Sequence, residues 1–242
     1  MIRNLIALCT ILFASSSFAA SITRETVTSG GGPRSFYLFV PDGEKPKPLV
    51  ILLHGSGRNG KILVEHWRGL AEKEGIVLAG PDASVSRGWS YPIDGPDFLR
   101  DVVEAVKGKV TIDDRRMYLF GHSAGATFSM QMTMLESTYF AATVAHAGLL
   151  PPADYGVIAA AERKIPVMLI IGSEDPGYPV KEVRATHDAL AEAGHPVQMI
   201  EIPRHGHDYY SKSKYVNEKA WAFLSAHRLD KAPKYLSSRP PE

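Results

Sequence analysis

The sequence has one cysteine, Cys9, in 242 residues, and it has almost no excess of charge of either sign. A disulfide within the chain needs two thiols, so none forms and the fold must be stabilised by its own core. The 27 Lys and Arg residues are matched by 26 Asp and Glu residues. Without a basic excess there is no field to attract nucleic acid or an anionic membrane, and we expect neither as a partner.

Residues 1–20 have the composition of a secretory signal peptide. Arg3 gives a positive start, an apolar stretch follows, and small residues end the segment. We expect cleavage after Ala19 or Ala20, which leaves a secreted or periplasmic protein without a membrane anchor. Loss of Arg3 also leaves 26 basic and 26 acidic residues. The alternative, an uncleaved anchor, is disfavoured because spanning a bilayer takes about 20 apolar residues and this run is much shorter.

The rest of the chain alternates short apolar segments with longer segments of helical spacing. The apolar segments predict strands over 35–41, 48–55, 75–83, 115–123, 139–148, 165–176 and 195–207. The helical spacing predicts helices over 62–74, 97–107, 124–135, 179–193 and 213–227. This alternation predicts one α/β domain, residues 21–235, with a mostly parallel central sheet and helices on both faces. The polar, proline-rich residues 236–242 are expected to form a loose tail.

A serine lies among small residues in the segment Gly121-His122-Ser123-Ala124-Gly125. The segment fits the pattern G-x-S-x-G and stands between a predicted strand and a predicted helix, the context that gives this pattern its meaning. A sharp turn there lifts the serine hydroxyl above the sheet, and the glycines let strand and helix approach each other. We therefore predict Ser123 as a nucleophile.

A serine nucleophile needs a base and an acid that orients the base, and both follow in the chain. Asp175 ends one predicted strand and His207 ends the next, so both are expected at the carboxyl edge of the sheet, near Ser123. Glu174 is the alternative acid, but Asp175 directly precedes a Pro-Gly turn and is preferred. His205 is the alternative base, but a glycine directly before His207 favours that residue.

Two backbone N–H groups are expected to bind the oxyanion. One belongs to Ala124, directly after the nucleophile, and the other to the glycine-rich loop that follows the strand 48–55. Ser56 is the predicted second donor, and His54 is expected to be structural. A metal site of His205, His207 and Asp208 is the other way to use these histidines, but it lacks further ligands of suitable spacing. We expect no metal and no cofactor.

Several segments together resemble the α/β-hydrolase superfamily over nearly the whole chain after residue 20. The succession LLHGSGRN, GPDA, DFLRDVVEAV, IDDRRMYLFGHSAGA, IGSEDPGYPV and HGHDYY resembles its secreted esterase branch of polyhydroxybutyrate depolymerases and feruloyl esterases. The resemblance implies an α/β-hydrolase fold and a serine esterase that forms and hydrolyses an acyl-enzyme. The sequence departs from the branch at Ala126, where relatives usually have a glycine directly after the one at position 125. It also lacks the additional substrate-binding domain that polymer depolymerases often carry. A soluble or small ester, of feruloyl or hydroxyalkanoate type, is therefore expected.

The pocket is expected to be open, because the segment between the strands that end at 148 and begin at 165 is too short for a large lid. Trp89, Tyr91 and Tyr178 are its predicted walls, and the first two suit an aromatic acyl group. The alternative for Trp89 and Tyr91 is that they close the core under a loop. His66, Trp67 and His146 are treated as structural residues.

The same triad would serve a dienelactone-type hydrolase, a thioesterase or a peptidase. A binding protein that kept the fold but lost turnover is a further alternative, disfavoured because all the expected site residues are present. A monomer or small homo-oligomer is expected.

Overall fold

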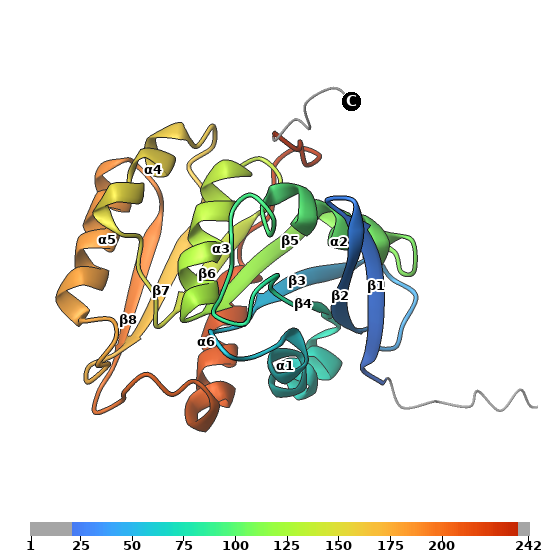
Figure 1. Ribbon diagram of the computed structural model, residues 1–242, viewed down its shortest axis with the longest axis horizontal. Helices are drawn as coiled ribbons and strands as arrows, with labels where there is room; N and C mark the ends of the chain where they lie inside the picture. The colour runs from blue at the N-terminus through green and yellow to red at the C-terminus, as the bar shows by residue number, and fades with distance from the viewer. Residues whose placement is uncertain (1–20, 237–242) are drawn as a thin grey trace, which may run out of the picture.

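The computed structural model describes residues 21–236, which form one eight-stranded sheet covered by helices (Figure 1). The strands are β1 (Thr23–Ser29), β2 (Gly32–Phe39), β3 (Lys47–Leu53), β4 (Val77–Pro81), β5 (Ile112–His122), β6 (Ala142–His146), β7 (Val167–Gly172) and β8 (Val197–Ile202). Their order in the sheet is β1-β2-β4-β3-β5-β6-β7-β8. The pairs from β4 to β8 are parallel, and β1 and β2 are antiparallel additions at one edge. The predicted α/β-hydrolase architecture is therefore confirmed.

The helices cover both faces of the sheet. They are α1 (Gly60–Glu74), α2 (Pro96–Lys107), α3 (Ala124–Leu135), α4 (Gly156–Ala160), α5 (Val180–Glu192) and α6 (Ser213–Leu224), with short 3-10 turns at Pro152–Asp154 and Tyr210–Lys212. One core cluster joins the sheet to α2, α3, α4 and α5, and the other joins it to α1 and α6. Alternate residues of β3 enter opposite clusters, which explains why this strand is apolar at nearly every position.

The first strand was not predicted from the sequence. β1 pairs with β2 through a Gly30-Gly31 turn, but its residues are mostly polar and exposed because it lies at the sheet edge. Several predicted strands are also too long. The segment predicted as a strand over 195–207 ends at Ile202, because Pro203 has no N–H for the ladder and Arg204 has a positive φ of 51°.

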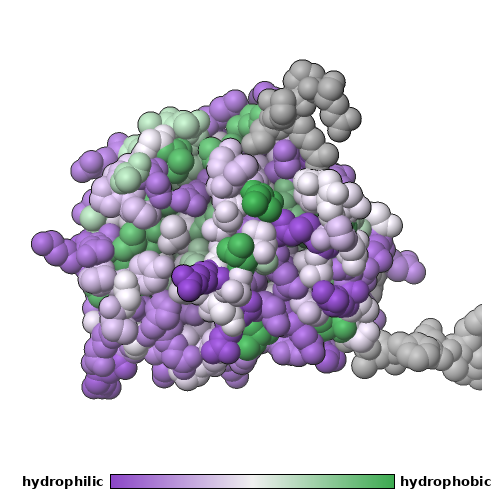
Figure 2. All heavy atoms as spheres, viewed as in Figure 1, coloured by the Kyte–Doolittle hydropathy of each residue, from purple (hydrophilic) through white to green (hydrophobic). Residues whose placement is uncertain are grey.

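The connection between β6 and β7 is fully described and holds only α4 and one 3-10 turn, so no large lid is inserted there. No helix within residues 21–236 is long and apolar enough to cross a membrane. Figure 2 shows a mostly hydrophilic face on which hydrophobic residues occur in separate spots. The predicted signal segment 1–20 and residues 237–242 of the predicted tail lie outside the described residues.

The loops that follow β3 and β5 lie next to each other at the point where the connections between strands change direction along the sheet. From β3 the chain goes to β4 on one side and then returns to β5 on the other. The loops after β3 and β5 therefore leave the carboxyl edge in opposite directions, and a crevice opens between them. These are the loops that contain Ser56 and Ser123.

Candidate active site

Ser123 occupies a strained turn between β5 and α3. Its backbone has φ 56° and ψ −122°, a conformation that L residues rarely adopt. A side chain at Gly121 would collide with the carbonyl oxygen of Gly125, and one at Gly125 would collide with that of Leu53. The two glycines of the sequence pattern therefore let strand and helix meet, as the pattern predicts, and the hydroxyl is raised at the edge of the sheet.

A chain of two hydrogen bonds joins Ser123 to the predicted base and the predicted acid. The Ser123 hydroxyl donates to His207 Nε2 over 2.8 Å, and His207 Nδ1 donates to Asp175 Oδ2 over 2.8 Å. The other oxygen, Asp175 Oδ1, accepts the N–H groups of Gly177 and Tyr178, each at 2.9 Å. The carboxylate is completely buried, so it remains fixed and fully hydrogen-bonded. Its bond to Nδ1 assigns the proton there and leaves Nε2 free to accept from the serine.

The two alternatives from the sequence lie elsewhere. Glu174 is exposed, and the His205 ring is buried beside His146 with its Nε2 atom unpartnered. The ring of Tyr178, a predicted pocket wall, stacks on that of His207 with centroids 5.6 Å apart and planes at 18°, but Tyr178 is not among the residues that line the hollow at Ser123. The geometry therefore selects Asp175 and His207.

The loop that follows β3 lies directly against the nucleophile. A Cβ atom at Gly55 would stand 3.2 Å from Ser123 Cβ, so any larger residue would press on the serine. The Ser56 hydroxyl donates to Arg87 O over 2.6 Å, so its proton is already used in a hydrogen bond within the protein. Ala124 is the first residue of α3, and its N–H therefore has no acceptor within the helix. Ser56 and Ser123 line the same hollow, and Ala124 directly follows Ser123, so both residues predicted as oxyanion donors border the nucleophile.

His54 has the structural position that was expected. Its Nε2 atom accepts the Ala83 N–H over 3.1 Å, so its proton is on Nδ1, which lies 2.9 Å from Gly55 O. Burial lowers the pKa of His54, which favours this neutral form.

A buried carboxylate that the sequence analysis did not single out organises the neighbouring loop 83–95. Asp94 is completely buried and accepts from the Ser84 N–H and hydroxyl, the Ser90 N–H and the Arg34 guanidinium. The loop in turn holds the oxyanion loop, since Gly57 N–H donates to Ser86 O over 2.7 Å. In the sequence Asp94 has the appearance of an ordinary turn residue before a glycine, and nothing there indicates its partners.

Trp89 and Tyr91 lie outside the hollow beside Ser123. The Trp89 ring stacks on Phe128 with centroids 5.3 Å apart, and its N–H donates to His54 O over 2.8 Å. This is the position of a residue that closes the core under the oxyanion loop. Tyr91 is 65% exposed and lines a different hollow of about 380 Å³ at the far end of α3.

The hollow at Ser123 has a volume of about 410 Å³ and a lining that combines apolar surface with several polar side chains. Arg58, Asp208 and Tyr210 contribute most of its polar groups beyond the triad, and the Arg58 guanidinium lies 5.2 Å from the centre of the Tyr210 ring. The lining residues are Gly55, Ser56, Arg58, His122, Ser123, His207, Asp208, Tyr209 and Tyr210. Two ionisable groups and a phenol ring give this hollow the means to bind a polar substrate.

Two histidines behind the triad were not assigned a chemical role from the sequence. His122 Nδ1 lies 3.0 Å from His146 Nδ1, and the His122 ring centre lies 5.2 Å from that of His207. Burial lowers the pKa of His122 to about 4 and that of His146 well below its usual range, with a smaller contribution from the neighbouring histidines. Both rings are therefore neutral near pH 7.

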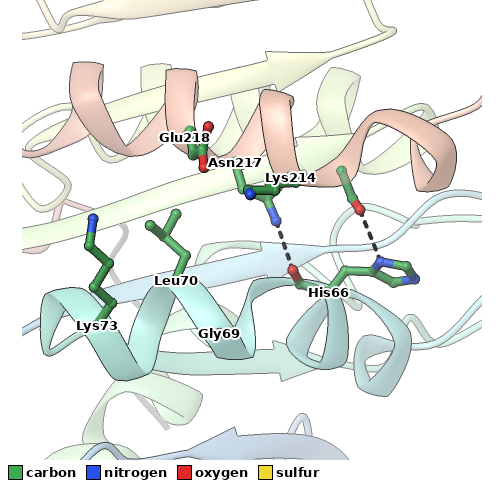
Figure 3. Close-up of a pocket in the computed structure, with 8 residues that line it drawn as sticks. His66, Gly69, Leu70, Lys73, Lys214, Asn217 and Glu218 are labelled. Atoms are coloured by element: carbon green, nitrogen blue, oxygen red, sulfur yellow. Dashed lines mark hydrogen bonds between the residues drawn. The ribbon is translucent and has the colours of Figure 1, made fainter.

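Another hollow within residues 21–236 lacks this chemistry. A hollow of about 430 Å³ lies between α1 and α6, where Asn217 donates to His66 O and His66 Nδ1 contacts the Ser213 hydroxyl (Figure 3). It contains no serine with a base and an acid in series. Within residues 21–236 no group of three or more His, Cys, Asp or Glu side chains is arranged to hold a metal ion, so His205, His207 and Asp208 do not form the alternative metal site.

The fold and the site define the class of protein: a serine hydrolase with the α/β-hydrolase fold. The model of the phospholipase/carboxylesterase family matches residues 98–227, more than half of the chain, and the chain belongs to this family. A bifunctional acetylxylan esterase/xylanase of Neocallimastix patriciarum is 26% identical over 151 residues, which cover 60% of this chain and 22% of that protein. The chain spans about a quarter of the length of the curated relatives it matches.

Solved structures show the same fold at low sequence identity. An S-formylglutathione hydrolase from Agrobacterium tumefaciens is 17% identical with a TM-score of 0.69, over 89% of this chain and 98% of that one. A ferulic acid esterase is 15% identical with a TM-score of 0.67, over 86% of this chain and 99% of that one. These structures share the α/β-hydrolase fold, in agreement with the family to which the chain belongs.

Proposed function

We propose that the protein is a secreted or periplasmic carboxylic ester hydrolase that uses Ser123, His207 and Asp175 as its catalytic triad. The observation that carries this proposal is the unbroken series of two 2.8 Å hydrogen bonds from the serine hydroxyl to the buried carboxylate. The signal-like residues 1–20 support the proposed location. The protein acts without a metal or cofactor, as a monomer or small homo-oligomer.

The geometry supports the following steps. His207 Nε2 removes the Ser123 proton as the oxygen attacks the ester carbonyl, and Asp175 stabilises the imidazolium that results. The N–H groups of Ser56 and Ala124 bind the oxyanion. The alcohol leaves with the proton from His207, and a water molecule that gives its proton to the same nitrogen attacks the acyl-enzyme. The free acid is released and Ser123 regains its proton.

The proposed substrate is a small or soluble ester of feruloyl or hydroxyalkanoate type. A hollow of about 410 Å³ that combines apolar surface with polar side chains suits such a molecule, and the described residues insert no large lid between β6 and β7. The matched relatives are named as an acetylxylan esterase and a ferulic acid esterase, which supports an ester with an acetyl or feruloyl acyl group. We place the protein near the feruloyl esterase and polyhydroxybutyrate depolymerase branch on the sequence motifs alone.

A panel of substrates tests this proposal. The protein lacking residues 1–20 and its Ser123→Ala variant are assayed with p-nitrophenyl esters of rising chain length, methyl ferulate, a thioester and an aminoacyl anilide. We expect hydrolysis of short esters, with turnover lower by roughly 10⁶-fold in the variant. Labelling of Ser123 by a fluorophosphonate probe without ester hydrolysis would shift the assignment to a dienelactone-type hydrolase, thioesterase or peptidase. Absence of labelling would indicate a binding protein.

A further inference from the structure

His122 and His146 meet because they end neighbouring strands. They are register partners at the carboxyl ends of β5 and β6, and their Nδ1 atoms lie 3.0 Å apart. A hydrogen bond between two such nitrogens needs one proton, which belongs to one ring only. Since both rings are neutral, one ring holds its proton on Nδ1 and the other holds its proton on Nε2.

Burial decides which ring holds which proton. His146 Nε2 is completely enclosed and has no hydrogen-bond partner within the described chain. A proton there would leave a buried N–H donor unpaired, which is rarer and more costly than an unpaired acceptor. His146 therefore holds its proton on Nδ1 and donates to His122. The His122 ring is left with its proton on Nε2.

The edge of the His122 ring that contains Nε2 lies toward the oxyanion loop, which borders the substrate hollow. His122 is one of the residues that line this hollow, and its Cδ2 atom, adjacent to Nε2, would be 3.3 Å from a Cβ atom at Gly55. The edge thus lies between the oxyanion loop and the His207 ring. The Nε2 atom is also absent from the enclosed, unpartnered atoms of the described chain, unlike the corresponding atom of His146.

We propose that His122 is a further substrate-binding residue that presents a fixed Nε2–H donor to an oxygen atom of the bound ester, and that His146 is the positioning residue that fixes this proton. The proposal rests on the proposed function, because the acceptor is an oxygen of the ester that Ser123 attacks. An oxygen acceptor, whether carbonyl, alkoxy or hydroxyl, is selected because the neutral ring offers a donor to the hollow. No proton is transferred by His122.

The proton positions are measured directly in the wild-type protein. In protein labelled with ¹⁵N in its histidine rings, long-range ¹H–¹⁵N correlation spectra distinguish Nδ1–H from Nε2–H. At pH 7 we expect Nε2–H for His122 and Nδ1–H for His146. His54 is the internal control, since the Ala83 N–H requires Nδ1–H there. An Nδ1 proton on His122 would overturn the inference whatever the activity of the protein.

Kinetics test whether the donor acts on the substrate. His122→Leu removes the donor and should lower kcat/KM about 10- to 100-fold, at or somewhat below the loss typical of one oxyanion donor. His122→Gln offers an amide donor at a similar reach and should recover most of this loss. A purely structural role predicts equal losses in the two variants, and that result would contradict the proposal.

His146→Leu separates positioning from contact. Without its partner the His122 ring is free to exchange its proton between both nitrogens, so kcat/KM should fall by less than in His122→Leu, and the ¹⁵N spectrum should show mixed forms of His122. Fluorophosphonate labelling of Ser123 in each variant reports an intact triad. If Ser123→Ala retains turnover, the proposed function is wrong. If Ser123→Ala is inactive but the His122 variants have the kcat/KM of the wild type, the proposed function stands and only this inference is wrong.

Discussion

Ala126 fills the space that a side chain at Gly148 would need. A Cβ atom at Gly148 would lie 2.5 Å from Ala126 Cβ, and 3.1 Å from both Ser123 O and Thr127 N. The branch that the sequence resembles usually has glycine where Ala126 stands. The methyl group of Ala126 is therefore accommodated by the glycine at the second position after β6, and the two residues form a matched pair next to the nucleophile.

This pairing predicts a strong coupling between the two positions. Gly148→Ala should reduce the free energy of unfolding by about 1–3 kcal/mol, the usual cost of overpacking, and should also reduce turnover because the clash reaches Ser123. Adding Ala126→Gly to this variant should restore part of the stability and part of the turnover. In a double-mutant cycle measured by urea unfolding, the interaction energy between the two positions should be about 1 kcal/mol or more.

Gly69→Ala is the matched control for the cycle. It lies inside α1, and a Cβ atom there would meet nothing within 4 Å, so the change should be neutral or stabilising by up to about 1 kcal/mol. If Gly148→Ala cost the same with glycine or alanine at position 126, the two side chains would not be competing for one space.

The two histidines of the HGH segment should differ sharply in function. His207→Ala removes the base that lies 2.8 Å from the Ser123 hydroxyl and should lower kcat by roughly 10⁴- to 10⁶-fold. His205→Ala removes a ring that contacts His146 but none of the reacting groups, and kcat should remain within a few-fold of the wild type. Initial rates on p-nitrophenyl acetate, with thermal unfolding of both variants, check this contrast. Greater loss of turnover in His205→Ala would show that the base is misassigned.

Much of the fold and of the triad is predictable because the signals are local. The helix at Ala124–Leu135 and the G-x-S-x-G turn are encoded by contiguous residues, and Asp175 and His207 follow strands whose ends must meet at one edge. Ser56 and Ala124 are expected as oxyanion donors on the same local signals, and their role stays a prediction. What is local in the sequence is therefore recovered well.

The remaining features depend on contacts that no local pattern encodes. The Arg34–Asp94 ion pair joins residues 60 positions apart and organises a loop whose sequence looks like an ordinary turn. His122 and His146 meet only through the register of β5 and β6. The edge strand β1 is polar on most of its residues, so the apolar pattern that reveals buried strands is missing there.

Trp89 should affect turnover through the oxyanion loop. Trp89→Phe keeps a ring against Phe128 but removes the hydrogen bond to His54 O, at a typical cost of about 0.5–1.5 kcal/mol. We expect kcat/KM to fall by about 2- to 10-fold, equally for p-nitrophenyl acetate and methyl ferulate, because the loop serves every ester. Trp221→Phe, on the opposite face of the sheet, is the control and should leave both rates unchanged. A loss confined to the KM for ferulate would instead indicate that Trp89 stacks on the aromatic acyl group.

The buried histidines should make the fold sensitive to mild acid. Burial lowers the pKa of His122 to about 4 and holds the pKa of His146 well below its usual range, whereas both ionise near 6.5 in the unfolded chain. Between these values the unfolded state binds protons that the folded state does not, so the free energy of unfolding falls as pH falls from about 6.5 to 4. His122 alone contributes a loss of the order of 3 kcal/mol over this window. Carboxylates with lowered pKa values, such as Asp113 and Asp208, add their losses only at lower pH, since they stay ionised until then.

Urea-unfolding midpoints measured from pH 8 to pH 4 check this sign. The wild type should lose stability steadily below pH 6.5, and His146→Leu should show a shallower slope because one buried histidine no longer takes up a proton on unfolding. Above pH 7 the two curves should run parallel, whatever the offset between them, because no histidine titrates there. If the slopes below pH 6.5 are equal, His146 takes up its proton in the folded state as readily as in the unfolded chain, and the neutral His122–His146 pair does not exist.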